Sequence, residues 1–309
     1  MLSPWSRRLL LLNVIAQIGI VVTGGLVRLT GSGLGCPTWP QCVPGSYTPV
    51  LQQAEGFHKY IEFGNRLLTF VVLATAVAVI LIGVRQVRSG RPGRLLVPAA
   101  IPLALVVAQA VIGGITVLTG LHPATVATHF LVSMLLVAAS VYAWLRLDAP
   151  DGPTAPAVRV EIRWLYAVCV LVAVAILVLG TVVTGSGPHS GDAETPARFA
   201  LDPRTVSWLH ADLVMAFCGL VIGLLVAVRV AGGRPRLLHA CAALVAVTLA
   251  QGLIGYVQYF TGLPEALVAA HMLGASLLVV ALVVVGFRLQ IRLDPEPARS
   301  IATATAVAA

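Results

Sequence analysis

The chain has 309 residues, of which 58% are hydrophobic and 10% are charged, and its mean hydropathy is +0.94. So little charge excludes an ordinary soluble domain of this size. A formal net charge of +8 could indicate a nucleic-acid partner, but the basic residues flank apolar segments and do not form a basic domain, so we expect no nucleic-acid binding.

Apolar runs long enough to cross a bilayer as helices, about 20 residues each, recur along the whole chain. They cover roughly residues 9–29, 59–84, 95–118, 125–145, 164–184, 205–228, 237–260 and 266–287. The runs are continuous rather than alternating, which favours helices over the strands of a barrel. The sequence therefore predicts an all-α integral membrane protein with eight transmembrane helices.

The basic residues are divided unequally between the two sets of helix ends. One set holds 15 of the 20: Arg7, Arg8, Arg85, Arg88, Arg91, Arg94, Arg146, Arg159, Arg163, Arg229, Arg234, Arg236, Arg288, Arg292 and Arg299. The other set holds Arg28, Lys59, Arg66, Arg198 and Arg204. Because cytoplasmic loops are enriched in Lys and Arg, this bias predicts that the first set and both termini are cytoplasmic.

The first outer loop, at about residues 30–57, contains Cys36 and Cys42 with two prolines between them. Thiols outside the cytoplasm at such a spacing can close a disulfide or cycle as a redox-active pair. We expect Cys36 and Cys42 to pair in one of these two ways; the alternative is two unpaired thiols.

The second helix begins with a cluster of ionisable side chains. His58, Glu62 and Arg66 are spaced by four residues, so they share one helical face. Glu55 joins that face if the helix begins early enough. Ionisable groups in a membrane segment indicate a functional site, although a Glu62–Arg66 ion pair could also be purely structural.

A long motif occurs twice. The first copy is Gln109, Gly113, Thr119-Gly120-Leu121, Val126 and His129, and the second is Gln251, Gly255, Thr261-Gly262-Leu263, Val268 and His271. Every position is displaced by 142 residues (251 − 109). A looser repeat relates Thr30-Gly31-Ser32-Gly33 to Thr184-Gly185-Ser186-Gly187. The repetition predicts one structural unit used twice.

The two units divide at the Pro- and Gly-containing segment 146–163. We expect two tandem four-helix bundles, at residues 1–154 and 155–309. Four helices return the chain to its starting side, so the bundles should be oriented in parallel. This disfavours a transporter built from inverted repeats.

Each unit carries two histidines at matching places: His58 and His129 in the first, His210 and His271 in the second. All four are expected near the outer membrane face, at the beginnings of the even-numbered helices. Two imidazoles from facing helices suit the axial positions of a haem iron, whereas zinc would require further ligands.

Acidic residues distinguish the two units. A shift of 152 (210 − 58) aligns His58 with His210. It also aligns Glu55 with Ser207, Glu62 with Val214 and Arg66 with Cys218. A site that only holds a cofactor needs ligands, but a reacting site also needs groups that move protons or stabilise charge. We infer that the first unit performs chemistry and the second carries a resident cofactor.

Together these features resemble the bacterial haem A synthases over nearly the whole chain. The resemblance rests on the Thr-Gly-Ser-Gly stretches, the cysteines of the first loop, Glu55-x-x-His58, the two Thr-Gly-Leu…His motifs and four histidines on eight helices. It implies a multi-pass protein of the bacterial plasma membrane. Its activity would be oxidation of a methyl group of haem O to the formyl group of haem A, by successive hydroxylations, for cytochrome oxidase.

The resemblance also implies roles for individual residues. His210 and His271 would ligate a haem b cofactor, His58 and His129 would face the substrate haem O, and Glu55 would be the catalytic carboxylate. Lys59, Glu62 and Arg66 could be charge or propionate partners. Expected partners are haem O, haem A, membrane lipid, the haem O-forming prenyltransferase and a membrane electron acceptor, with homo-oligomers also possible.

Two departures from the family pattern stand out. Many bacterial members have a second cysteine pair in the third outer loop, but residues 185–204 contain no cysteine. Lys59 stands where an arginine is expected, which removes a bidentate contact to a propionate.

Three other functions compete with haem A synthesis. A bis-histidine b-type cytochrome would only relay electrons, and the acidic asymmetry argues against it. A transporter is disfavoured by the parallel repeat. The prenyltransferase would need aspartate-rich magnesium sites for a diphosphate, which the membrane segments do not contain.

Overall fold

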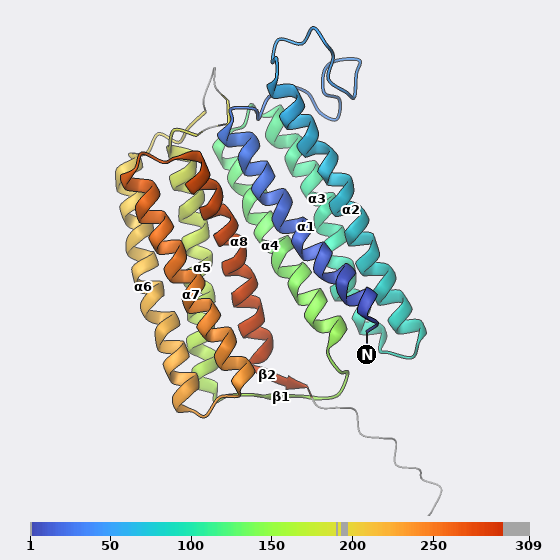
Figure 1. Cartoon of the computed structure of the whole chain (residues 1–309), viewed down its shortest axis with the longest axis vertical. Helices are drawn as coiled ribbons and strands as arrows, with labels where there is room; N and C mark the ends of the chain where they lie inside the picture. The colour runs from blue at the N-terminus through green and yellow to red at the C-terminus, as the bar shows by residue number, and fades with distance from the viewer. Residues whose placement is uncertain (1, 190, 193–196, 293–309) are drawn as a thin grey trace, which may run out of the picture.

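The computed structural model describes residues 2–189, 191–192 and 197–292. Eight long helices account for most of them (Figure 1): α1 (Pro4–Leu29), α2 (His58–Arg88), α3 (Leu96–Leu118), α4 (Pro123–Asp148), α5 (Val160–Ser186), α6 (Pro203–Val230), α7 (Pro235–Phe260) and α8 (Glu265–Arg288). Each is long and apolar enough to cross a membrane. The prediction of an all-α, multi-pass membrane protein is confirmed.

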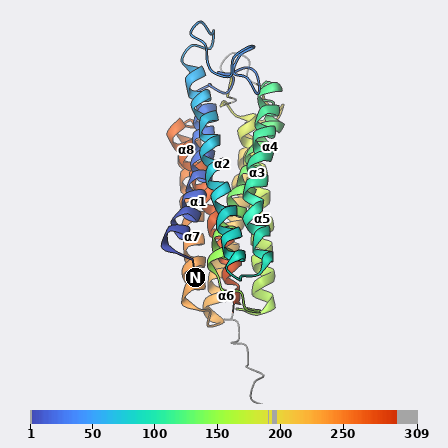
Figure 2. The same ribbon diagram turned by 90° about the vertical axis from the view of Figure 1, so that its right-hand side faces the viewer.

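The helices pack largely in chain order, as two groups standing side by side (Figures 1 and 2). In the first group α1 packs on α2, α2 on α3, α3 on α4, and α4 returns to α1. In the second, α5 to α8 pack consecutively and α8 touches α5. Consequently α2 and α4 occupy opposite corners of one group, and α6 and α8 occupy opposite corners of the other.

The interface between the groups is made by α8 and α5 on one side and α1 and α4 on the other. Its apolar centre includes Val21, Met134, Val137 and Val279, which are all buried. A separate and larger apolar core fills the second group alone, between α5, α6, α7 and α8. The functional division at residues 154 and 155 stays a prediction.

All helices run nearly the full height of the molecule, so the loops gather at two ends. One end contains the N-terminus and the segments 89–95, 149–159, 231–234 and 289–292, and we call it the arginine end. The opposite end contains the segments 30–57, 119–122 and 261–264 and the beginnings of the four even-numbered helices, and we call it the histidine end.

The repeated Thr-Gly-Leu segments form equivalent turns at the histidine end. In both, the glycine and the leucine have positive φ: 61° and 56° at Gly120 and Leu121, and 80° and 59° at Gly262 and Leu263. Glycine adopts this region freely, whereas a branched apolar residue is uncommon there. The leucine N–H closes each preceding helix by donating to the carbonyl of Thr116 or Gln258. These turns set the direction in which α4 and α8 enter the bundle.

Two short strands lie at the arginine end. β1 (Thr154–Pro156) belongs to the linker between the groups and pairs antiparallel with β2 (Gln290–Arg292), which follows α8. The N–H of Ala157 also donates to the carbonyl of Leu289, at 2.8 Å. The linker is therefore fastened to the end of the last helix.

Candidate haem-binding and catalytic site

The four histidines lie at the histidine end, on the helices that the sequence predicted. His58 is the first residue of α2, and His129, His210 and His271 lie in the early turns of α4, α6 and α8. Since α2 and α4 stand at opposite corners of their group, the first two histidines come from opposed helices. The same holds for the second pair.

The Nδ1 atom of His58 lies 2.8 Å from the hydroxyl oxygen of Ser32. If Nδ1 carries the proton and donates it, Nε2 is left as the free base that binds iron. Ser32 is fully buried and comes from the Thr-Gly-Ser-Gly stretch after α1. The sequence showed this stretch only as a repeat and gave no sign of its contact with the histidine.

The other three imidazoles are held differently. Nδ1 of His129 and of His271 is buried, and no described residue hydrogen bonds to it. Nδ1 of His210 is also buried and faces the backbone of Ile176 without the geometry of a hydrogen bond. Buried and unsatisfied ring nitrogens are rare in a finished core. If these rings bind a ligand, Nε2 would be the nitrogen that does so, because Nδ1 lies on the side of the glycine backbones.

Glycines flank these same three rings. A Cβ atom added to Gly113 would lie 3.2 Å from Cε1 of His129, and one added to Gly255 would lie 3.4 Å from Cε1 of His271. Gly180 stands in the same relation to His210, at 3.3 Å. The backbones of α3, α7 and α5 thus lie directly against the imidazoles, and a side chain at these glycines would crowd the rings.

Two glutamines of the repeated motif fix the backbone beside the histidines. The amide nitrogen of Gln109 donates to the carbonyl oxygen of His129 at 2.9 Å, and that of Gln251 donates to the carbonyl oxygen of His271 at 2.8 Å. Each bond joins two neighbouring helices within the membrane region. The exact repeat spacing signalled these glutamines in the sequence, but not their function as positioning residues.

Glu55 lies in the turn before α2 and not on the helix. Its carbonyl oxygen accepts the N–H of His58, at 3.1 Å. Its carboxylate atom Oε2 is buried, and no described residue hydrogen bonds to it. The condition for Glu55 to share the helical face, an early start of α2, is therefore not met. Glu55 nevertheless lies three residues before His58, in the turn that leads into α2.

The side chains of Glu62 and Arg66 bind to each other and to the backbone of the first loop. Their side chains form an ion pair at 2.6 Å, with only 7% of the Glu62 side chain exposed. Glu62 also accepts the N–H of Cys36, at 2.6 Å. Arg66 donates to the carbonyls of Cys36, Thr38 and Gln41. The ion pair thus organises the loop that the Cys36–Cys42 disulfide closes.

Lys59 is likewise committed. Its side chain is buried, and its ammonium donates to the carbonyls of Val50 and Leu51 at 2.6 and 3.0 Å. Lys59, Glu62 and Arg66 therefore all hold the loop over α2. Their use as charge or propionate partners stays a prediction, but the structure gives each of them another role.

Replacing Glu62 by Gln is expected to loosen this loop. The change leaves Arg66 without its charged partner, and breaking a largely buried ion pair costs about 3 kcal/mol. Opening of the loop, and hence cleavage of the Cys36–Cys42 disulfide by a mild reductant, should become about 100-fold faster. Alkylation of the released thiols, followed by mass spectrometry, measures that rate.

The matched control is Glu161→Gln, which breaks the exposed Arg159–Glu161 pair on α5. The disulfide of this variant should be reduced at the wild-type rate, because exposed ion pairs contribute little to stability. An unchanged rate in Glu62→Gln would mean that the buried pair does not hold the loop.

The site residues form two pairs of histidines. Each group of helices supplies one pair of histidines, which come from opposed helices and lie at the same end of the molecule. The Nδ1 atom of His58 contacts Ser32, whereas the Nδ1 atoms of the other three have no hydrogen-bond partner among the described residues. Among the described residues, the one buried carboxylate atom without a hydrogen-bond partner is Oε2 of Glu55, which precedes His58 by three residues. This arrangement can hold iron at two places and supply a proton-accepting group at one of them.

Comparisons with known proteins agree with this geometry. The chain is 34% identical to the haem A synthase of Geobacillus thermodenitrificans over 145 residues, which are 45% of this chain and 42% of the relative. It is 33% identical to that of Geobacillus kaustophilus over 135 residues (43% and 40%) and 31% identical to that of Alkalihalophilus pseudofirmus over 139 residues (44% and 45%). These matches span less than half the length of each curated relative.

A family model described as cytochrome oxidase assembly protein matches residues 7–190. That is more than half of the chain, and it includes His58, His129 and the first loop with its disulfide. The chain therefore belongs to the COX15-CtaA family of cytochrome oxidase assembly proteins, in which the resemblance to haem A synthases had placed it.

Proposed function

We propose that this protein is a haem A synthase, which oxidises a methyl group of haem O to the formyl group of haem A by successive hydroxylations. The observation that carries the proposal is the difference between the two histidine pairs. Both can ligate iron, but the first pair is accompanied by Glu55, three residues before His58, whose buried Oε2 atom has no hydrogen-bond partner among the described residues. The curated relatives are named haem A synthases, which supports the same function.

The first group of helices would bind the substrate. His58 and His129 would face haem O, with Ser32 orienting the ring of His58 and Gln109 holding the backbone at His129. Conversion of a methyl to a formyl group removes two C–H bonds from one carbon, so protons must leave that carbon. Glu55 would accept a proton or stabilise positive charge that develops there.

The second group would hold a resident haem b through His210 and His271. When bound, this haem would supply one-electron redox chemistry. The protein supplies its ligands and an apolar environment, while Gln251 holds the backbone at His271. No acidic residue occupies the positions that correspond to Glu55 and Glu62, which are Ser207 and Val214.

The arginine end would face the cytoplasm of a bacterial cell, with both termini, and the histidine end would face outward. Haem O would come from the haem O-forming prenyltransferase, and electrons would leave to a membrane acceptor. The Cys36–Cys42 disulfide fits the oxidising outer side.

Pigment analysis tests the proposed reaction. The full chain is produced in a bacterial host that makes haem O but has no haem A synthase of its own, and haems are extracted and identified by mass spectrometry. We expect haem A, with its formyl group, only in cells that contain the protein. Cells with normal amounts of haem-loaded protein and haem O alone would show a b-type cytochrome that relays electrons instead.

A further inference from the structure

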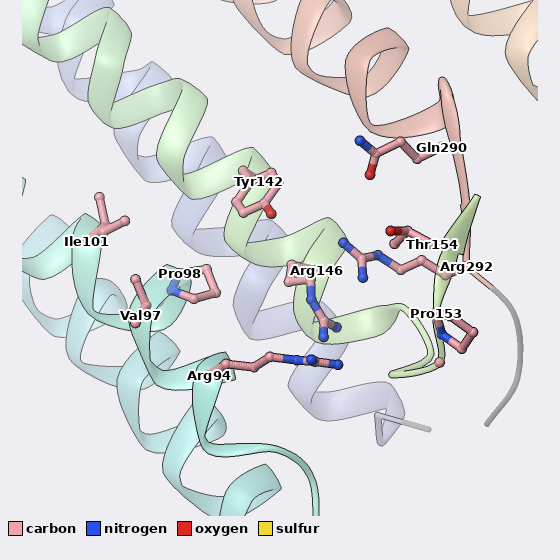
Figure 3. A pocket seen from close by; sticks show the side chains of 11 residues that line it. Arg94, Val97, Pro98, Ile101, Tyr142, Arg146, Pro153, Thr154, Gln290 and Arg292 are labelled. Atoms are coloured by element: carbon pink, nitrogen blue, oxygen red, sulfur yellow. The ribbon is translucent and has the colours of Figure 1, made fainter. Parts of the chain in front are cut away.

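A cavity of about 630 Å³ lies at the arginine end, far along the helices from the histidines. Residues of α3 and α4, the linker with β1, and β2 form its walls (Figure 3). It therefore opens where the linker between the two groups meets the end of the last helix. The proposed reaction uses none of its residues.

Three guanidinium groups line this cavity, from Arg94, Arg146 and Arg292. The carboxylate of Asp151 is shared between one of these arginines and a neighbour: it lies 2.8 Å from Arg146 and 2.6 Å from Arg91. Burial alone would raise the pKa of Asp151, but hydrogen bonds from Arg91 and Arg146 hold that pKa below its ordinary value. One carboxylate is thus divided between two arginines, and positive charge is left over.

Two of the arginines keep unused donors. The side chain of Arg146 is only 6% exposed, and its Nη1 atom is buried without any hydrogen-bond partner in the described part of the chain. Arg292 lies 5.7 Å from the ring of Phe287, and within residues 2–189, 191–192 and 197–292 no acid forms an ion pair with it. Burial, followed by the charges of Arg146 and Arg94, lowers the pKa of Arg292. A bound anion would remove this repulsion.

One wall of the cavity is apolar. Val97 and Ile101 on α3 line it and are 63% and 42% exposed. Tyr142 lies on the α4 side, with its ring 6.1 Å from that of Phe287 in an edge-to-face arrangement. Aromatic rings are typical of the boundary between the hydrocarbon core and the headgroups. The site therefore joins a cationic pocket to an apolar, membrane-facing strip.

We propose that this cavity binds the phosphate headgroup of an anionic phospholipid, with an acyl chain along Val97 and Ile101. Arginines at a membrane boundary recognise phosphate through charge-assisted hydrogen bonds, and basic pockets between transmembrane helices bind anionic headgroups. The headgroup would bridge the turn before α3, α4 and β2, and so brace the linker against the end of α8. The proposal is independent of the haem chemistry.

Lipid binding to the purified full chain tests the proposal. Delipidated protein in detergent is titrated with dioleoyl phosphatidylglycerol, and bound lipid is counted by native mass spectrometry. In parallel, thermal unfolding is followed with phosphatidylglycerol, with phosphatidylcholine or with inorganic phosphate. We expect one tightly held phosphatidylglycerol, and a rise in unfolding temperature with that lipid alone.

The principal variant is Arg292→Gln, because this guanidinium has no ion pair to lose among the described residues. Losing a charge-assisted hydrogen bond should weaken phosphatidylglycerol binding about tenfold or more. Arg94→Gln should weaken it as well. Arg88→Gln, an exposed arginine at the same end but outside the cavity, should bind like the wild type.

Three results would overturn the proposal. Equal stabilisation by inorganic phosphate and phosphatidylglycerol would indicate a site for a soluble anion. Equal binding to Arg88→Gln and Arg292→Gln, both weaker than wild type, would indicate general surface charge. If phosphatidylglycerol binds only to a chain that is shortened to end at Arg292, the chain's own Asp294 and Glu296 compete for the site.

Discussion

Replacing either His210 or His271 by Ala is expected to remove the resident low-spin haem b. Each imidazole would supply one of two axial ligands, and its ring lies against a glycine backbone that offers no substitute donor. The affinity for haem should fall by more than the roughly 10- to 100-fold that is typical when a residue that only hydrogen bonds to a metal ligand is replaced. Haem content and the visible and electron paramagnetic resonance spectra of purified protein measure the effect.

The control for this experiment is His239→Ala, since His239 is exposed at the arginine end. It should retain a normal haem spectrum. His58→Ala and His129→Ala should also keep the resident haem b while losing binding of added haem O. If both the His210 and the His271 variants kept a normal spectrum, the second group would not be the cofactor site.

Glu55→Gln is expected to produce a protein that folds, keeps haem b and binds haem O, yet makes little haem A. The amide retains the size of the side chain but cannot accept a proton. Removing a general base typically slows a reaction by about 10²- to 10⁴-fold. Since Oε2 of Glu55 has no partner among the described residues, the change should not break a structural contact. The ratio of haem A to haem O in extracted pigments reports turnover.

Glu62→Gln and Glu265→Gln complete this comparison. The Glu62 variant should lose stability more than turnover per folded molecule, because Glu62 serves the loop through Arg66 and Cys36. Glu265 is an exposed carboxylate in the first turn of α8, at the same end, and its variant should behave like the wild type. If Glu55→Gln made near-normal amounts of haem A, the catalytic group would be Glu62 or would not be a carboxylate.

The amino-acid sequence was sufficient to predict the helices and the placement of the histidines along them. A span of about 20 apolar residues has few alternatives to a helix in a membrane, since the backbone must satisfy its own hydrogen bonds there. The exact repeat from Gln109–His129 to Gln251–His271 then implied equivalent sites in two units. These signals are local or periodic, so they can be read without knowing which helices touch.

The contacts of the polar side chains became visible in the folded structure. Glu62 and Arg66 share a helical face with His58 in the sequence, but they bind the backbone of Cys36, 26 and 30 residues away. Ser32 reaches His58 across 26 residues. The arginine cavity combines residues from Arg94, in the turn before α3, to Arg292 on β2, nearly 200 positions apart (292 − 94). Such contacts depend on how the helices and loops pack, and a single sequence carries no local pattern that records them.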